Sequence, residues 1–99
     1  MKIENVKTLI KLNENDEEGL RYSALITLMF NTKPTEGYTA RKMKDLIDLM
    51  TVLDGASDKE EFELTEEQLK EVKETLSTYK WPFVHKDIVA LMEYLETVA

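Results

Sequence analysis

The amino-acid sequence predicts a mainly α-helical fold, a compact four-helix single domain that spans residues 1–99. Three observations predict it. The chain of 99 residues has the length of one domain, so two independent cores are not expected. Apolar residues recur at helical spacing in several segments. The 3 Gly and 2 Pro residues fall in or beside the polar stretches between those segments, where they favour breaks.

The N-terminal dozen residues fit two patterns. Val6, Thr8, Ile10 and Leu12 alternate as in a strand. The set Ile3, Val6, Leu9 and Ile10 also fits one face of a helix. We favour an extended segment, because β-branched residues occupy the alternating positions. Phe62 and Leu64 alternate with glutamates further along the chain. Residues 5–12 and 61–64 are therefore the candidates for a short two-stranded β ribbon.

The first two helices are expected on either side of a loop at 35–38. The first helix is expected to be capped by Asn15 or Asp16 and to run to about Asn31. Its apolar residues cover more than one stripe of the helix surface, so we expect it to be the most buried helix. Pro34 follows it. The second is expected from about Thr39 to Leu53, with Gly55 as a left-handed stop. Its predicted core face is formed by Met43, Leu46, Ile47, Met50 and Leu53.

The third helix begins with a capping-box pattern, in which Thr65 takes the N-cap and Gln68 the third helical position. A break at Trp81-Pro82-Phe83 separates it from the fourth helix. The expected core residues of the third helix are Leu69, Val72, Leu76 and Tyr79. The fourth helix carries Ile88, Val89, Leu91, Met92, Leu95 and Val98.

The net charge of −7 is concentrated in one half of the chain. Residues 1–50 carry eight acidic and eight basic side chains, whereas residues 51–99 carry twelve acidic and five basic ones. This asymmetry predicts an electronegative face that either solubilises the protein or meets a basic partner. The absence of cysteine excludes disulfides and thiolate zinc sites. No apolar run is long enough for a signal peptide or a membrane span, so we predict a cytoplasmic protein without a membrane partner.

No residue pattern predicts catalysis, a metal site or a cofactor. The single histidine, His85, precedes the fourth helix and is two residues from Asp87, but no nucleophile lies at a recognisable spacing. The run 64–74 resembles the helix that leads into the calcium loop of calmodulin-like EF-hand proteins. The residues after it, 77–82, lack the carboxylates and the glycine of that loop. We therefore predict a protein that is not an enzyme.

Two groups of residues are candidates for protein contact. The first is an aromatic corner formed by Tyr79, Trp81 and Phe83, since Trp and Tyr are enriched at interface hot spots. The same rings can instead plug the junction between the third and fourth helices. The second is an acidic rim formed by Glu60, Glu61, Glu63, Glu66 and Glu67. Such a rim can pair with a basic partner or be merely solvated.

The combined pattern predicts a small acidic, non-enzymatic protein–protein interaction module: an adaptor, an inhibitor or an assembly factor. Small stand-alone acidic proteins of this kind fit a phage or other mobile element. The alternative is a small nucleic-acid-binding regulator that uses Arg41, Lys42 and Lys44 at the basic start of the helix at 39–53. Three cations are few for nucleic acid at physiological salt, so a protein partner is favoured. A homodimer is compatible with the composition.

Overall fold

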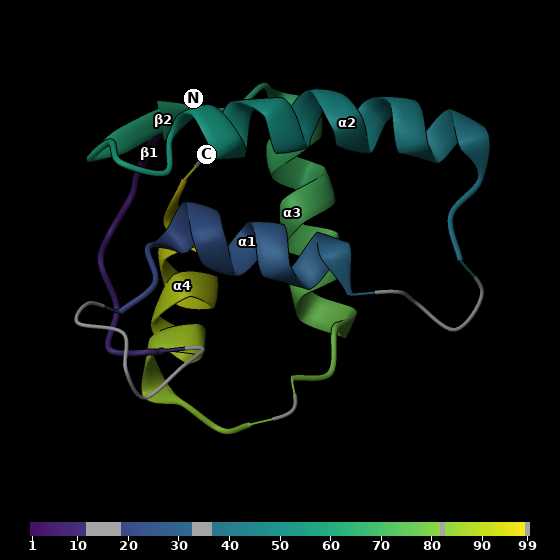
Figure 1. The fold of residues 1–99 in the computed structure, drawn as a ribbon. Coiled ribbons are helices and arrows are strands. Elements are labelled where there is room, and N and C mark those ends of the chain that lie inside the picture. Colours follow the sequence, from purple (N-terminus) through teal and green to yellow (C-terminus); the bar gives the residue numbers. More distant parts are fainter. Residues whose placement is uncertain (12–18, 33–36, 82, 99) are drawn as a thin grey trace.

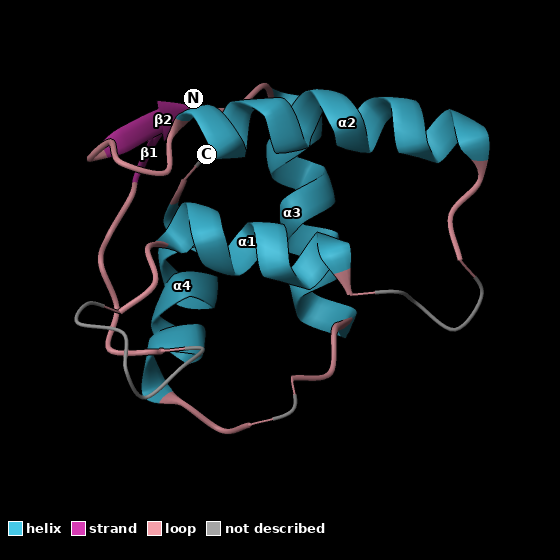
Figure 2. Ribbon diagram, viewed as in Figure 1, coloured by secondary structure: helices cyan, strands magenta, loops and turns pink. Residues whose placement is uncertain are grey.

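The computed structural model describes residues 1–11, 19–32, 37–81 and 83–98, and it confirms a mainly α-helical chain with a short β ribbon (Figures 1 and 2). The elements in this part of the chain are β1 (Lys2–Glu4), α1 (Tyr22–Asn31), α2 (Ala40–Gly55), β2 (Glu61–Glu63), α3 (Glu66–Thr78) and α4 (Lys86–Thr97). The radius of gyration of 13.1 Å is that of a compact chain of this length.

The ribbon forms earlier in the chain than the sequence suggests. Strands β1 and β2 are antiparallel, with Ile3 opposite Phe62, and both side chains are buried. The predicted strand at 5–12 was therefore wrong in its position, with Leu12 outside the described residues. The segment 6–10 is extended but pairs elsewhere: its backbone exchanges hydrogen bonds with residues 20–22. Glu61 and Glu63 alternate with Phe62 and point outward, as expected for a ribbon with one buried face.

Asn5 fastens this N-terminal segment to two other parts of the chain. Its side-chain amide donates to the carbonyl oxygens of Ala56 (2.8 Å) and Lys59 (2.9 Å). Its side-chain oxygen accepts from the backbone N–H of Ser23 (2.8 Å). The end of α2 and the start of α1 are thereby joined through one buried side chain.

Helix α1 begins later than predicted, at Tyr22, and its N-cap residue Arg21 makes no side-chain cap. Asn15 and Asp16, the predicted caps, lie outside the described residues. The first backbone N–H groups of α1 instead bond to residues far away in the sequence. Tyr22 N–H donates to the carbonyl of Val6 (3.0 Å), and Ser23 N–H donates to the side-chain oxygen of Asn5. These long-range partners replace the local cap that a helix N-terminus normally needs. As expected for the most apolar helix, its buried residues are Tyr22, Ser23, Leu25, Ile26, Met29 and Phe30.

Helix α2 begins as predicted but turns a different face to the core. Thr39 caps it by accepting from the N–H of Lys42 (3.1 Å). The buried residues are Leu46, Leu49 and Leu53, whereas Met43 and Ile47 are 47% and 63% exposed. The predicted core face was therefore wrong at Met43 and Ile47. The core meets the face of α2 that carries Leu46, Leu49 and Leu53, and Figure 1 shows that the N-terminal end of α2 extends past α1 and α3.

The end of α2 also differs from the prediction. Gly55 is the last helical residue and does not adopt the left-handed conformation. Within the described residues, Gly37 is the one with a positive φ, 74°. It lies in the loop before α2, where a turn needs a conformation that side chains disfavour.

Helix α3 matches its predicted pattern closely, whereas α4 buries only part of its predicted apolar set. The capping box is present in α3: Gln68 N–H donates to Thr65 Oγ1 (3.1 Å) and Thr65 N–H donates to Gln68 Oε1 (3.0 Å). Its buried residues are Leu69, Val72 and Leu76, and Tyr79 is half-buried at the C-cap. In α4 the buried residues are Leu91 and Leu95, while Val89 and Met92 are exposed.

Tyr22 gives the fold a measurable response to alkaline pH. Burial, together with the charges of Asp87, Tyr94 and Glu4, raises the pKa of its hydroxyl above the ordinary value. The hydroxyl therefore ionises more readily in the unfolded chain, so its stabilising effect is complete below about pH 10 and is lost as the pH rises. We expect the free energy of unfolding to fall more steeply above about pH 10 in the native sequence than in Tyr22→Phe. Urea denaturation at a series of pH values measures both slopes; identical slopes would contradict the assignment.

Candidate protein-contact surface

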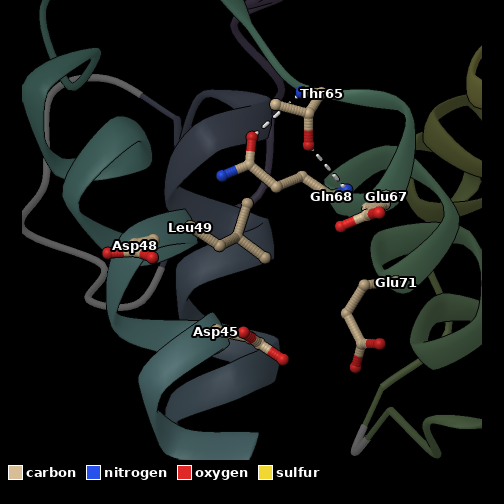
Figure 3. Close-up of a pocket in the computed structure, with 7 residues that line it drawn as sticks. All are labelled: Asp45, Asp48, Leu49, Thr65, Glu67, Gln68 and Glu71. Carbon is tan, nitrogen blue, oxygen red and sulfur yellow. Dashed lines mark hydrogen bonds between the residues drawn. The ribbon is translucent and has the colours of Figure 1, made fainter.

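A groove between α2 and α3 gathers carboxylates from both helices (Figure 3). It encloses about 340 Å³ and is lined by Asp45, Asp48, Leu49, Thr65, Glu67, Gln68 and Glu71. We call it the acidic groove. Figure 3 shows Asp45 on α2 and Glu71 on α3 facing the same gap, with the Thr65–Gln68 capping box at one end. Lys42 spans the two helices as an ion pair with Glu71. The remaining carboxylates make this groove attractive to cationic side chains.

The opposite flank of α2 carries an apolar groove. A hollow of about 240 Å³ is lined by Phe30, Asn31, Tyr38, Met43, Leu46, Ile47 and Met50. A second hollow of about 340 Å³ is lined by Thr27, Asn31, Ile47, Met50, Thr51 and Asp54. The two hollows share Asn31, Ile47 and Met50, so they adjoin along α1 and α2, and we call them together the apolar groove. Tyr38 is anchored in it by a hydrogen bond from its hydroxyl to the carbonyl of Phe30 (3.1 Å).

The predicted basic cluster is divided by the fold. Lys42 is held by Glu71, while Arg41 and Lys44 are exposed. Asp45 and Asp48 follow within the next turn, so the cations do not form an uninterrupted positive patch. Phosphate contacts need such a patch, because each contributes only modestly at physiological salt. This arrangement gives the nucleic-acid alternative less support than the sequence did.

The aromatic corner lies at the junction of α3 and α4. Tyr79, Trp81 and Phe83 are half-buried and pack against the core. Their ring centroids are 4.8 Å apart for Tyr79–Trp81, in an edge-on arrangement, and 5.9 Å apart for Trp81–Phe83. The Tyr79 hydroxyl donates to Thr32 Oγ1 (3.0 Å), which ties the corner to the end of α1. These contacts favour the interpretation that the three rings fill the junction between α3 and α4. A role for the rings in binding a partner protein stays a prediction.

The predicted acidic rim is spread over three places, and Glu60 lies in the bend directly before β2. All five glutamates are exposed. Glu61 pairs with Lys2 across the ribbon (3.4 Å), and Glu63 lies on the same outer face of β2. Glu66 and Glu67 occupy the first turn of α3, where they favour the helix dipole. Of the predicted rim, Glu67 lines the acidic groove.

The sequence analysis did not predict the residues of the acidic groove that come from α2 and from the second turn of α3. Asp45, Asp48 and Glu71 lie outside the rim segment, and nothing local indicates that they meet Glu67. For Met43 and Ile47 a signal was present, because they are four residues apart on one face of a helix. That signal was assigned to the core, since spacing alone does not distinguish an inner face from an outer one.

His85 has a structural role. Its Nδ1 accepts a hydrogen bond from the backbone N–H of Asp87 (3.1 Å), which caps α4. The Asp87 carboxylate in turn accepts from the backbone N–H of Leu9 (2.9 Å). Both side chains therefore organise the backbone of the helix start and of the N-terminal segment. Across the described residues, no three His, Asp or Glu side chains are placed to share a metal ion.

Comparison of the chain with protein-family models, with curated proteins and with solved structures finds no match. In the described residues, none of the helices combines the length and the apolar character needed to span a bilayer. The two grooves that flank α2 are the surface features of the described residues that bear on function.

Proposed function

We propose that the protein is a non-enzymatic protein–protein interaction module whose contact element is helix α2. The observation that carries this proposal is the exposure of Met43 and Ile47 beside the apolar groove. Isolated apolar residues are common on protein surfaces, but projecting side chains next to an apolar hollow are typical of a contact site. Burying one such side chain stabilises a complex by about 1.5–3 kcal/mol before the costs of association.

The two flanks of α2 define the chemistry that a partner must present. The apolar groove accepts aliphatic or aromatic side chains, which supply most of the affinity. The acidic groove accepts a Lys or Arg side chain, which supplies orientation and specificity. An adaptor, an inhibitor or an assembly factor can act in this way. Action in the cytoplasm is part of the proposal, and the absence of cysteine makes a reducing compartment suitable.

A pull-down with matched variants tests this surface. Native protein is expected to retain a partner from host lysate at moderate salt, and Ile47→Glu is expected to lose it, because the carboxylate would be desolvated against apolar side chains. Val84→Glu is the control, since Val84 is a fully exposed aliphatic residue away from both grooves. If the native protein and Ile47→Glu capture the same proteins, α2 is not the contact element.

A further inference from the structure

The apolar groove contains both a projection and a hollow. Met43 and Ile47 are exposed and project from α2, and the adjoining hollow is floored by Phe30, Leu46 and Met50. A patch that carries both shapes can meet a rotated copy of itself, because a two-fold axis places each projection opposite the hollow of the other copy. The patch therefore has the shape property required for an isologous contact.

The spacing along α2 also suits a second helix. The outer stripe consists of Ala40, Met43, Ile47, Met50 and Asp54, at intervals of three, four, three and four residues. This is the a/d spacing with which one helix packs along another. The buried stripe of the same helix, Leu46, Leu49 and Leu53, lies beside it, and Leu46 also lines the hollow. Helix α2 can thus keep its core contacts while its outer stripe packs against another helix.

Charge indicates which partner fits and in which direction. The chain has a net charge of −7, but α2 carries three basic and three acidic residues and is neutral. Its exposed cations, Arg41 and Lys44, lie near its N-terminus, and Asp54 lies near its C-terminus. An antiparallel second α2 brings Lys44 beside Asp54 of the other copy, twice by symmetry. The two helix dipoles also oppose each other in this arrangement, which favours it.

We infer that the occupant of the apolar groove is a second copy of this chain, bound antiparallel along α2 in a two-fold dimer centred between Ile47 and Met50. This inference rests on the contact surface proposed above and names its partner. A neutral helix in an acidic protein lets a second copy approach along it with little net charge repulsion. Each side chain in the interface occurs twice, so each substitution acts twice.

Sedimentation velocity over a wide range of protein concentration tests the dimer. The native protein is expected to pass from monomer to dimer as concentration rises. Ile47→Glu is expected to weaken dimerisation by roughly a hundred-fold or more, because two carboxylates would face apolar side chains near the axis. Val84→Glu is expected to dimerise as the native protein does. Circular dichroism checks that each variant is folded, which exposed positions permit.

A charge-reversal series tests the antiparallel direction. Lys44→Glu and Asp54→Lys are each expected to weaken the dimer several-fold, and the double variant is expected to recover most of that loss. Failure of the double variant to recover would overturn the antiparallel geometry. A native protein that stays monomeric throughout, or a dimer that Ile47→Glu leaves intact, would overturn the self-association. A monomer that still captures a partner in an Ile47-dependent manner would overturn the dimer while supporting α2 as a contact element.

Discussion

Replacement of Asn5 by alanine is expected to lower the free energy of unfolding by about 2–4 kcal/mol. The buried Asn5 amide group satisfies three backbone groups, the carbonyls of Ala56 and Lys59 and the N–H of Ser23. Alanine removes all three hydrogen bonds and leaves the buried N–H of Ser23 without a partner. The carbonyl of Ala56 still accepts from the N–H of Lys59 (3.0 Å), and the carbonyl of Lys59 still accepts from Arg21 Nη1 (3.3 Å). Each lost hydrogen bond contributes about 0.5–1.5 kcal/mol. Each unsatisfied buried group costs about 1–3 kcal/mol.

Urea denaturation followed by circular dichroism measures this loss. Asn31→Ala is the matched control, because Asn31 is exposed at the end of α1 and the same atoms are removed. A change within about 0.5 kcal/mol is expected for the control. A loss below about 1 kcal/mol in Asn5→Ala would mean that water or a backbone shift replaces the missing bonds.

The role of Asn5 also marks a limit of prediction from the sequence. The capping box of α3 was predictable because Thr65 and Gln68 are three residues apart and their pairing depends on nothing else. The bonds of Asn5 reach across 18, 51 and 54 residues. No local pattern encodes such distances. The same reason explains the displaced ribbon, whose register is set by which apolar residue faces Phe62.

The sequence identified little of the candidate site, because two of the four carboxylates that line the acidic groove, Asp45 and Asp48, come before residue 50. The excess of carboxylates after residue 50 indicated an electronegative surface, and Glu67 does line the acidic groove. Asp45 joins it only because α2 and α3 meet at this groove in the folded chain. Likewise, the five regularly spaced apolar residues of α2 predicted a helix correctly. Which of them are buried depends on where the neighbouring helices end, and that is a property of the assembled fold.

Replacement of Gly19 by alanine is expected to be the other strongly destabilising change. An added Cβ would lie 1.7 Å from the carbonyl oxygen of Thr8 and 2.6 Å from its carbonyl carbon. These are backbone atoms, and they are held in place because Thr8 N–H donates to Leu20 O (2.9 Å) and Leu20 N–H donates to Ile10 O (2.7 Å). The two segments must separate to admit a methyl group, so those hydrogen bonds are lost together. We expect a loss of at least about 3 kcal/mol and a thermal midpoint lower by roughly 12–24 °C.

Gly55→Ala separates this close approach from the general effect of replacing glycine. Apart from its chain neighbours and the backbone of its own helix, nothing lies within 4 Å of the position that a Cβ would take at Gly55, and the residue is helical. The control is therefore expected to be neutral or more stable by about 0.5–1 kcal/mol, because alanine loses less backbone entropy in a helix. Thermal denaturation of both variants gives the comparison. Equal midpoints would show that residues 8–10 do not lie against Gly19, and the N-terminal segment would then have to cap α1 by some other path.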